Sequence, residues 1–184
     1  MLLRLCFTTI GVFFTLVLAV GIAIAQSSNA PVSRHEPDAN AHPGQPFHDP
    51  RGLYSLSMPP GWDLTLSGED PTFHNGSSWI QVRLLNAPSP AAAVDIAAAE
   101  FRGHFTTFNT INRGETIIAG RQSHGQNIDA VTPTGERVSV LVTAQPTPTA
   151  RQFLVLISST PVTQAPQLNT AVMAFATSVR FHAQ

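Results

Sequence analysis

The chain has 184 residues, of which 43% are hydrophobic and 11% are charged. This composition favours one compact domain over a disordered chain, a coiled coil or a multidomain enzyme. The 10 basic residues are all Arg, they face 11 acids and they form no cluster. We therefore predict no nucleic-acid partner, because duplex binding requires several cations placed against the phosphates.

Residues 1–25 have the pattern of an export signal. Arg4 precedes an apolar run, and the small residues Ala23 and Ala25 stand where a signal peptidase would cleave. The run is long for a cleaved signal, so an uncleaved N-terminal anchor is the alternative interpretation. Both interpretations place the rest of the chain outside the cytoplasm, in the periplasm or secreted. Membrane contact is expected only through residues 1–25, if they stay attached.

The single cysteine, Cys6, lies inside this apolar run. The segment after the signal can therefore form no internal disulfide and holds no thiol nucleophile. Cys6 also stands too early to be the lipid-accepting residue at the end of a lipoprotein signal, so a diacyl anchor is not expected.

Residues 26–47 are predicted to form a flexible linker. They contain four prolines with Ser, Asn, Ala and Gly, and almost no apolar residue that could define a core face. Three histidines in or next to this segment, His35, His42 and His48, could bind zinc or copper together with nearby carboxylates. Their spacing matches no zinc motif, so we predict no metal and no cofactor, with metal capture as the open alternative.

Short strands separated by turns follow. Residues 53–58 form a first strand that stops at Pro59-Pro60-Gly61, and residues 63–66 and 72–74 are weaker strand candidates. Residues 79–85 form a stronger strand, because apolar and polar residues alternate along it. Its apolar face is Ile80, Val82 and Leu84, and its other face is Trp79, Gln81 and Arg83.

An Ala-rich helix is predicted to begin at Ser89-Pro90. The Ser hydroxyl can cap free backbone N–H groups, and the missing N–H of Pro costs nothing in the first turn. We expect this helix to reach about Phe108. A buried stripe at three- and four-residue spacing would comprise Val94, Ala98, Phe101, Phe105 and Phe108.

Four further strands and a second helix complete the pattern. The strands are predicted over residues 115–119, 122–130, 136–144 and 151–158, and the helix over residues 166–179. Residues 138–142 and 153–157 are apolar on both faces, so they should be central strands with cover on both sides. We predict an α+β domain over residues 48–184. It would be a mainly antiparallel sheet of about six to seven strands with helices packed on it.

The order of these elements resembles the PsbP-like fold. This α/β/α sandwich is shared by photosystem II extrinsic subunits, Mog-type Ran-binding proteins and many small exported bacterial proteins. The resemblance rests on the strand that runs into Pro60-Gly61-Trp62, the strand at Ile80, the helix after Ser89, the turn Ala119-Gly120-Arg121, and the final helix ending near Phe181. The resemblance implies an accessory or partner-binding role and carries over no site residue.

No set of residues in the sequence matches a known catalytic arrangement. Ser123-His124 is the nearest approach to a nucleophile and base, but adjacent residues on a strand point to opposite faces. The histidines His74, His104 and His182 lie on separate elements without metal-ligand spacing. We therefore predict no enzyme and name no catalytic, cofactor or metal residue.

The predicted function is a non-catalytic accessory or partner-binding domain of the cell envelope with a protein partner. A small-ligand or metal carrier is the first alternative, and an aromatic pair of Trp62 and Trp79 or the row Trp79, Gln81 and Arg83 could supply its site. An enzyme of unrecognised type is the second alternative.

Overall fold

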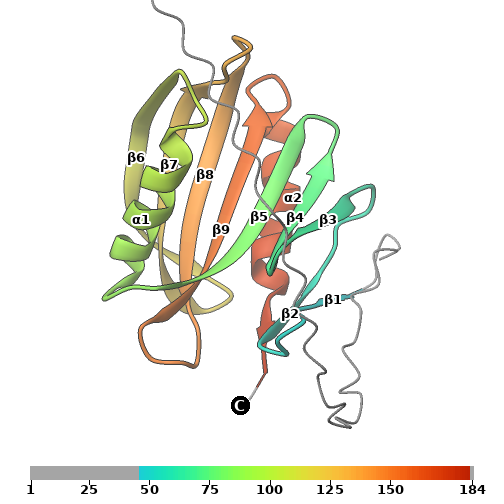
Figure 1. The fold of residues 1–184 in the computed structure, drawn as a ribbon, viewed down its shortest axis with the longest axis vertical. Coiled ribbons are helices and arrows are strands. Elements are labelled where there is room, and N and C mark those ends of the chain that lie inside the picture. Colours follow the sequence, from blue (N-terminus) through green and yellow to red (C-terminus); the bar gives the residue numbers. More distant parts are fainter. Residues whose placement is uncertain (1–45, 183–184) are drawn as a thin grey trace, which may run out of the picture. The chain divides into compact units, whose positions relative to one another are not determined.

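The computed structural model describes residues 46–182 of the chain (Figure 1). They form ten strands and two helices. In chain order the elements are β1 (Pro46–His48), β2 (Tyr54–Ser57), β3 (Asp63–Ser67), β4 (Asp70–Asn75), β5 (Ser78–Asn86), α1 (Pro90–Arg102), β6 (Thr107–Ile118), β7 (Arg121–Val131), β8 (Arg137–Pro146), β9 (Gln152–Pro161), α2 (Ala165–Ser178) and β10 (Arg180–Phe181).

Seven strands form the main sheet, in the order β3-β4-β5-β9-β8-β7-β6. Every neighbouring pair is antiparallel. This confirms the predicted antiparallel sheet and the number of its strands. A second sheet, in the order β1-β2-β10, was not predicted, because β1 and β10 are only three and two residues long and show no periodicity.

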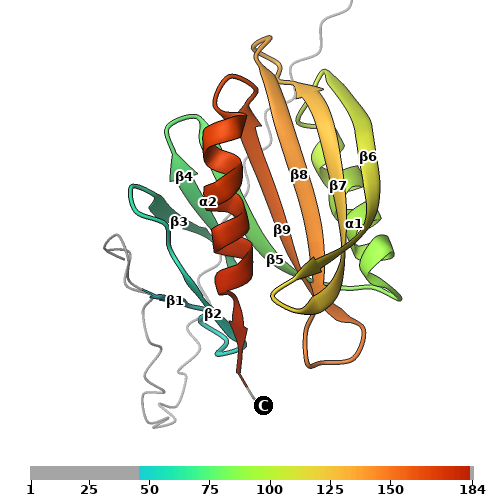
Figure 2. The same cartoon turned by 180° about the vertical axis from the view of Figure 1, so that it is seen from behind.

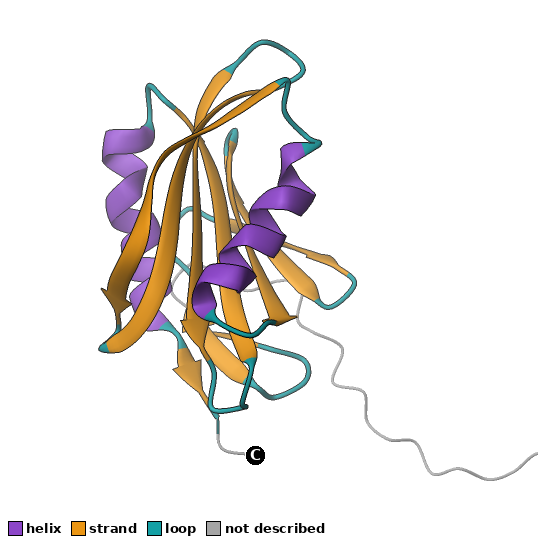
Figure 3. Ribbon diagram, turned by 90° about the vertical axis from the view of Figure 1, so that its left-hand side faces the viewer, coloured by secondary structure: helices purple, strands orange, loops and turns teal. Residues whose placement is uncertain are grey.

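The two strands predicted to be central, β8 and β9, lie inside the main sheet (Figure 1). Residues 153–160 of β9 are all buried. Val155 and Ile157 belong to a core cluster with α1, whereas Leu154 and Leu156 belong to a second cluster with α2. The two helices lie on opposite faces of the sheet (Figure 3). The predicted cover on both faces is thus confirmed.

Helix α1 begins as predicted and ends earlier. The Ser89 hydroxyl accepts a hydrogen bond from the backbone N–H of Ala92 at 3.2 Å. The helix stops at Arg102, with Gly103 as its C-cap, so the prediction that it continues to Phe108 is wrong. Glycine is a poor helix former, and strand β6 begins at Thr107. Phe105 and Phe108 nevertheless pack against the α1 cluster, from a loop and from β6.

Strand β1 revises the boundary of the predicted linker. Pro46 and Phe47 were assigned to the linker, but they form β1 together with His48. Phe47 pairs with Leu56 of β2, and its side chain is only 4% exposed. A single aromatic between Pro and His gives no periodic signal, so the sequence pattern missed it. The rest of the predicted linker and residues 1–25 lie outside the described residues.

Each helix covers only part of its sheet face. α1 packs on β7, β8 and β9, whereas α2 packs on β9 and on the small sheet. The cluster beneath α2 draws on Phe73 of β4 and Ile80 of β5. The α2-side face of β6, β7 and β8 is therefore left without a helix, as Figure 2 shows. Within residues 46–182, neither helix is long and apolar enough to cross a membrane.

Candidate functional site: a groove on the uncovered sheet face

A groove of about 470 Å³ lies on this uncovered part of the sheet, beside α2. Its volume is in the range of small-ligand sites in proteins. It is lined by residues of β6, β7, β8 and α2: Asn112, Arg113, Gly114, Glu115, Thr116, Ile118, Gly125, Asn127, Leu141, Thr143, Asn169 and Met173.

Two facing glycines form part of the groove floor. Gly114 of β6 is directly opposite Gly125 of β7, so two neighbouring strands lack a side chain at the same level. A Cβ added at Gly125 would meet the methyl groups of Thr143 and Thr116 at 3.7 and 3.8 Å, which are ordinary contacts. A Cβ would thus fit at Gly125, and at Gly114 it would meet nothing within 4 Å, so the absence of side chains leaves open space where another molecule can approach the backbone.

Neutral polar groups stand around this floor. The Asn127 side-chain amide donates a hydrogen bond to the Asn112 side-chain oxygen at 2.8 Å, which leaves the Asn112 amide nitrogen and the Asn127 oxygen for other partners. Thr143 is 5% exposed, and its buried hydroxyl has no hydrogen-bond partner among the described residues. A buried hydroxyl without a partner costs about 1–3 kcal/mol. The methyl group of Thr143 faces the glycine floor and its oxygen is covered, so a groove occupant would reach this hydroxyl only after the side chain rotates to another rotamer.

The rim of the groove on α2 combines an amide with a flexible apolar side chain. Asn169 and Met173 are one helical turn apart, and Met173 is 41% exposed. Leu141 of β8 and Ile118 at the end of β6 add apolar surface. Methionine adapts its shape to a partner more readily than branched residues do. The groove therefore offers hydrogen bonds and apolar contact together.

The nearest charged side chains on β6 point away from the groove. Arg113 forms an ion pair with Asp95 of α1 at 3.1 Å, which places its guanidinium on the opposite face of the sheet. Glu115 is two residues further along the strand, so it points to the same side as Arg113. Apart from Arg113 and Glu115, the residues that line the groove are uncharged, so the groove suits a neutral occupant.

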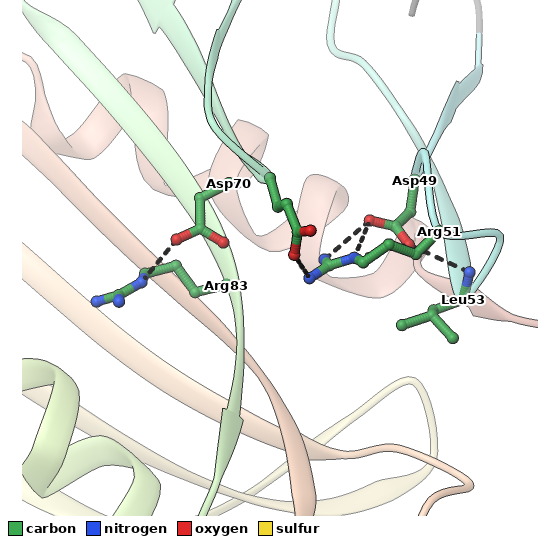
Figure 4. Close-up of polar contacts among 6 residues, drawn as sticks. Asp49, Arg51, Leu53, Asp70 and Arg83 are labelled. Atoms are coloured by element: carbon green, nitrogen blue, oxygen red, sulfur yellow. Dashed lines mark hydrogen bonds and ion pairs between the residues drawn. The ribbon is translucent and has the colours of Figure 1, made fainter. Parts of the chain in front are cut away.

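The ionised groups at the other end of the sheet have structural contacts. Asp49 is 3% exposed and accepts hydrogen bonds from Arg51 at 2.9 Å and from the backbone N–H of Leu53 at 3.2 Å (Figure 4). Arg51 also contacts Glu69 at 3.0 Å. Burial lowers the pKa of Arg51, but its hydrogen bond and attraction to Asp49 outweigh this, so the pKa is raised overall. This set fixes the turn before β2.

The predicted aromatic and Arg row is also occupied by internal contacts. Trp79 packs on Phe101 of α1 with ring centroids 5.5 Å apart. Arg83 donates to Asp70 at 3.0 Å (Figure 4) and also pairs with Glu100 of α1. Burial lowers the pKa of Arg83, but hydrogen bonds and attraction to these two carboxylates outweigh it and raise the pKa overall. Trp62 lies in the α2 cluster on the other face, so it forms no pair with Trp79.

The remaining sequence candidates are dispersed. Ser123 and His124 pair with Thr116 and Glu115 in turn, as expected for alternating faces of β7, and the Ser123 hydroxyl donates to the carbonyl of Arg121 at 3.1 Å. His48 stacks on His182 with centroids 6.4 Å apart. No group of three or more metal-ligating side chains occurs within residues 46–182. His35 and His42 lie outside the described residues.

The groove was not predicted from the sequence. Its floor depends on the register that sets Gly114 against Gly125, and its openness depends on which strands α2 covers. The signals available were Gly125 inside the predicted strand 122–130 and Gly114 just before the predicted strand 115–119, and a glycine within a strand often indicates close approach of another backbone.

No family model and no curated protein matches the chain. Several solved structures are similar to the chain. The cyanobacterial PsbP (CyanoP) of Synechocystis sp. PCC 6803 is 13% identical, with a TM-score of 0.56 over 75% of this chain and 92% of that chain. LpqN of Mycobacterium tuberculosis, involved in cell envelope biogenesis, is 14% identical, with a TM-score of 0.52 over 78% and 88%. The Ran-binding protein Mog1p of Saccharomyces cerevisiae is 10% identical, with a TM-score of 0.52 over 74% and 94%.

The chain has the PsbP-like fold. This confirms the architecture that the order of sequence elements indicated. At 10–14% identity the likeness concerns the fold alone.

Proposed function

We propose that this PsbP-like protein is an exported, non-catalytic binding domain of the cell envelope, and that its groove holds a neutral, extended segment of a protein partner. The observation that carries the proposal is the uncovered half of the sheet face, with two facing glycines in its floor and a buried, unpartnered hydroxyl at Thr143.

The chemistry of the groove suits a peptide backbone. Gly114 and Gly125 let another main chain come close to the sheet. Side-chain amides carry both donors and acceptors, which is what the N–H and C=O of a peptide group require. Met173 and Leu141 can contact an apolar side chain of the same segment. Amide and hydroxyl groups suit hydrogen bonding more than proton transfer at neutral pH, so binding is favoured over catalysis.

Two properties outside the groove support the envelope setting and the protein partner. The apolar pattern of residues 1–25 predicts export. Proteins of the same fold include one described as Ran-binding and one involved in cell envelope biogenesis. These neighbours favour a role in contact with another protein.

Site-directed photocrosslinking in the native envelope tests the proposal. A photoactivatable residue at Met173, on the groove rim, should capture a partner. The same residue at Ile96 is the matched control, because Ile96 is an exposed apolar position on the other helix with similar exposure, 39% against 41%. Amine-reactive reagents do not suit this protein, because its sequence has no lysine.

A second variant links capture to the groove. Gly125→Val adds bulk above the floor at a position where the first carbon meets only ordinary contacts. We expect it to abolish capture from Met173 and to weaken binding of the purified partner at least tenfold in calorimetry, which is about 1.4 kcal/mol. Equal capture from Met173 and Ile96, or capture that survives Gly125→Val in a protein with an unchanged circular dichroism spectrum, would contradict the proposal.

A small neutral ligand is the second candidate, and the Thr143 hydroxyl favours it. If the Thr143 side chain rotates to present its hydroxyl to the groove, this donor and acceptor suits a polyhydroxylated compound as well as a peptide. Calorimetry against a panel of neutral sugars and polyols distinguishes the two. A saturable heat that Thr143→Val removes would identify the small ligand, whereas no heat in the wild-type protein leaves the peptide. Zinc and copper titrations in the same panel test the predicted absence of a metal site.

A further inference from the structure

Strand β6 is an open edge of the main sheet. It has 12 residues and pairs only with β7 among the described strands, so one row of its backbone N–H and C=O groups faces outward. Such an edge can pair with a strand of another chain. The opposite edge, β3, is shorter, with five residues.

Two large apolar side chains project from β6 into solvent. Ile111 is 65% exposed and Ile117 is 73% exposed, the highest values among the large hydrophobic residues of the described chain. Ile111 is the extra residue at a register shift and has no partner on β7. Single exposed apolar residues are common on protein surfaces, but these two flank a pair of opposite charges on the same strand.

We propose that β6 pairs antiparallel with β6 of a second copy of this chain, around a two-fold axis at Gly114. In that register Ile111 faces Ile117 of the second copy, and Arg113 faces Glu115. Gly114 of one copy faces Gly114 of the other. When segment 111–117 of one copy pairs antiparallel with the same segment of the other, apolar residues therefore face apolar residues, and positive residues face negative ones. Arg113, Glu115 and Ile117 occupy alternate positions along β6 and so project from one face of the joined sheet, and Ile111 lies at the register shift where this regular stretch begins.

The charges distinguish this arrangement from a protected edge. A protected edge usually carries charges that repel a second copy, because like charges then meet across the strands. On β6 the charges are opposite and placed symmetrically about Gly114, so self-pairing is attractive. Glu115 is exposed and has no ion-pair partner within residues 46–182, whereas Arg113 already contacts Asp95 and keeps 48% of its side chain exposed.

Pairing would also extend the binding groove. Asn112, Gly114 and Thr116 line the groove on the α2-side face of β6. In the dimer, Asn112 of one copy lies opposite Thr116 of the other, so the two grooves become neighbours on one continuous sheet. The dimer is a separate inference from the proposed function, because Gly125→Val changes the groove without touching the edge.

Sedimentation of the exported protein, purified as cells produce it, measures the association. We expect a concentration-dependent dimer. Arg113→Glu and Glu115→Arg each place two like-charge pairs across the axis, so each alone should raise the dimer Kd about tenfold or more. A one-to-one mixture of the two variants should form a heterodimer at the wild-type strength, because every pair across the axis is then opposite in charge. Thermal unfolding of each variant shows whether it is folded.

Single cysteines test the register in a Cys6→Ala background. Only position 114 faces itself, so Gly114→Cys should form a disulfide-linked dimer on mild oxidation. Thr116→Cys is the control: its two copies would stand about 14 Å apart along the strands, beyond the reach of a disulfide. A wild-type protein that stays monomeric at about 1 mM would overturn the proposal. So would equal crosslinking at positions 114 and 116, or two charge variants that fail to associate although both are folded.

Discussion

The two ends of the main sheet differ in the length of the edge strand and in what covers its α2-side face. At the β3 end the edge strand is short, and its α2-side face is filled with apolar side chains that pack under α2 and the small sheet. Phe73 is the centre of this packing, with its ring 5.6 Å from that of Phe47 and 4.8 Å from that of Phe175. At the β6 end the edge strand is long, and its α2-side face has facing glycines and amides in place of a helix.

This contrast separates stability from recognition. The β3 end buries aromatic rings on both sides of an interface between sheet and helix, and such contacts supply most of the free energy of folding. The β6 end leaves two large isoleucine side chains exposed to water, a feature that a binding surface accounts for. We expect substitutions at the first end to unfold the protein and substitutions at the second to change what it binds.

The largest expected effect is at Phe73. Its side chain is fully buried between Phe47 and Phe175, so Phe73→Ala leaves a cavity and should lower the free energy of unfolding by about 3–5 kcal/mol. Ile117→Ala removes apolar atoms from the other end at an exposed position, and the change should stay within about 0.5 kcal/mol. Urea unfolding followed by circular dichroism measures both. A loss of similar size at the two positions would remove the distinction between the ends.

A second prediction uses the only tyrosine of the chain. Tyr54 is buried in the small sheet, and this burial, with the nearby negative charge of Asp49, raises the pKa of its phenol, while Arg51 opposes the shift. In the unfolded chain the phenol ionises near pH 10. Above that pH, ionisation therefore favours the unfolded state over the folded state. Stability should be complete below about pH 10 and then fall by up to about 1.4 kcal/mol per pH unit until the folded pKa is reached.

The composition of the sequence leaves few other groups that titrate in this alkaline range. It has no lysine, and Arg stays protonated throughout the range, so Tyr54 dominates titration above pH 10 in the described residues. Urea unfolding at several alkaline pH values gives the slope, and Tyr54→Phe should flatten it. Tyrosinate absorbance that develops near pH 10 while the protein is still folded would disprove the raised pKa and weaken the view of this end as the dry core.

Local sequence patterns predicted most helices and strands. The groove and the open sheet edge depend on which strands pair and in what register, which local patterns do not contain. The run at residues 153–157 indicated a central strand because no solvated face can tolerate it, and β9 is buried on both faces. Phe47 went unpredicted because one buried ring in a short strand has no period. The groove needed the register of Gly114 against Gly125, and the edge needed the strand order, neither of which a local pattern contains. The symmetry of residues 111–117 is readable in the sequence, but its exposure is not.

A small effect of the opposite sign is expected at Thr143. Thr143→Val keeps the shape of a 5% exposed side chain and removes a hydroxyl that has no hydrogen-bond partner in the described part of the chain. Replacing an unpaired buried polar group with an isosteric apolar group should stabilise the protein, by about 1 kcal/mol. If the β6 end is built for recognition, the same change should weaken partner capture from Met173. Urea unfolding and photocrosslinking of one variant therefore measure both quantities. A destabilised variant would mean that the hydroxyl already has a structural hydrogen bond, and a stabilised variant with full capture would mean that the groove floor takes no part in binding.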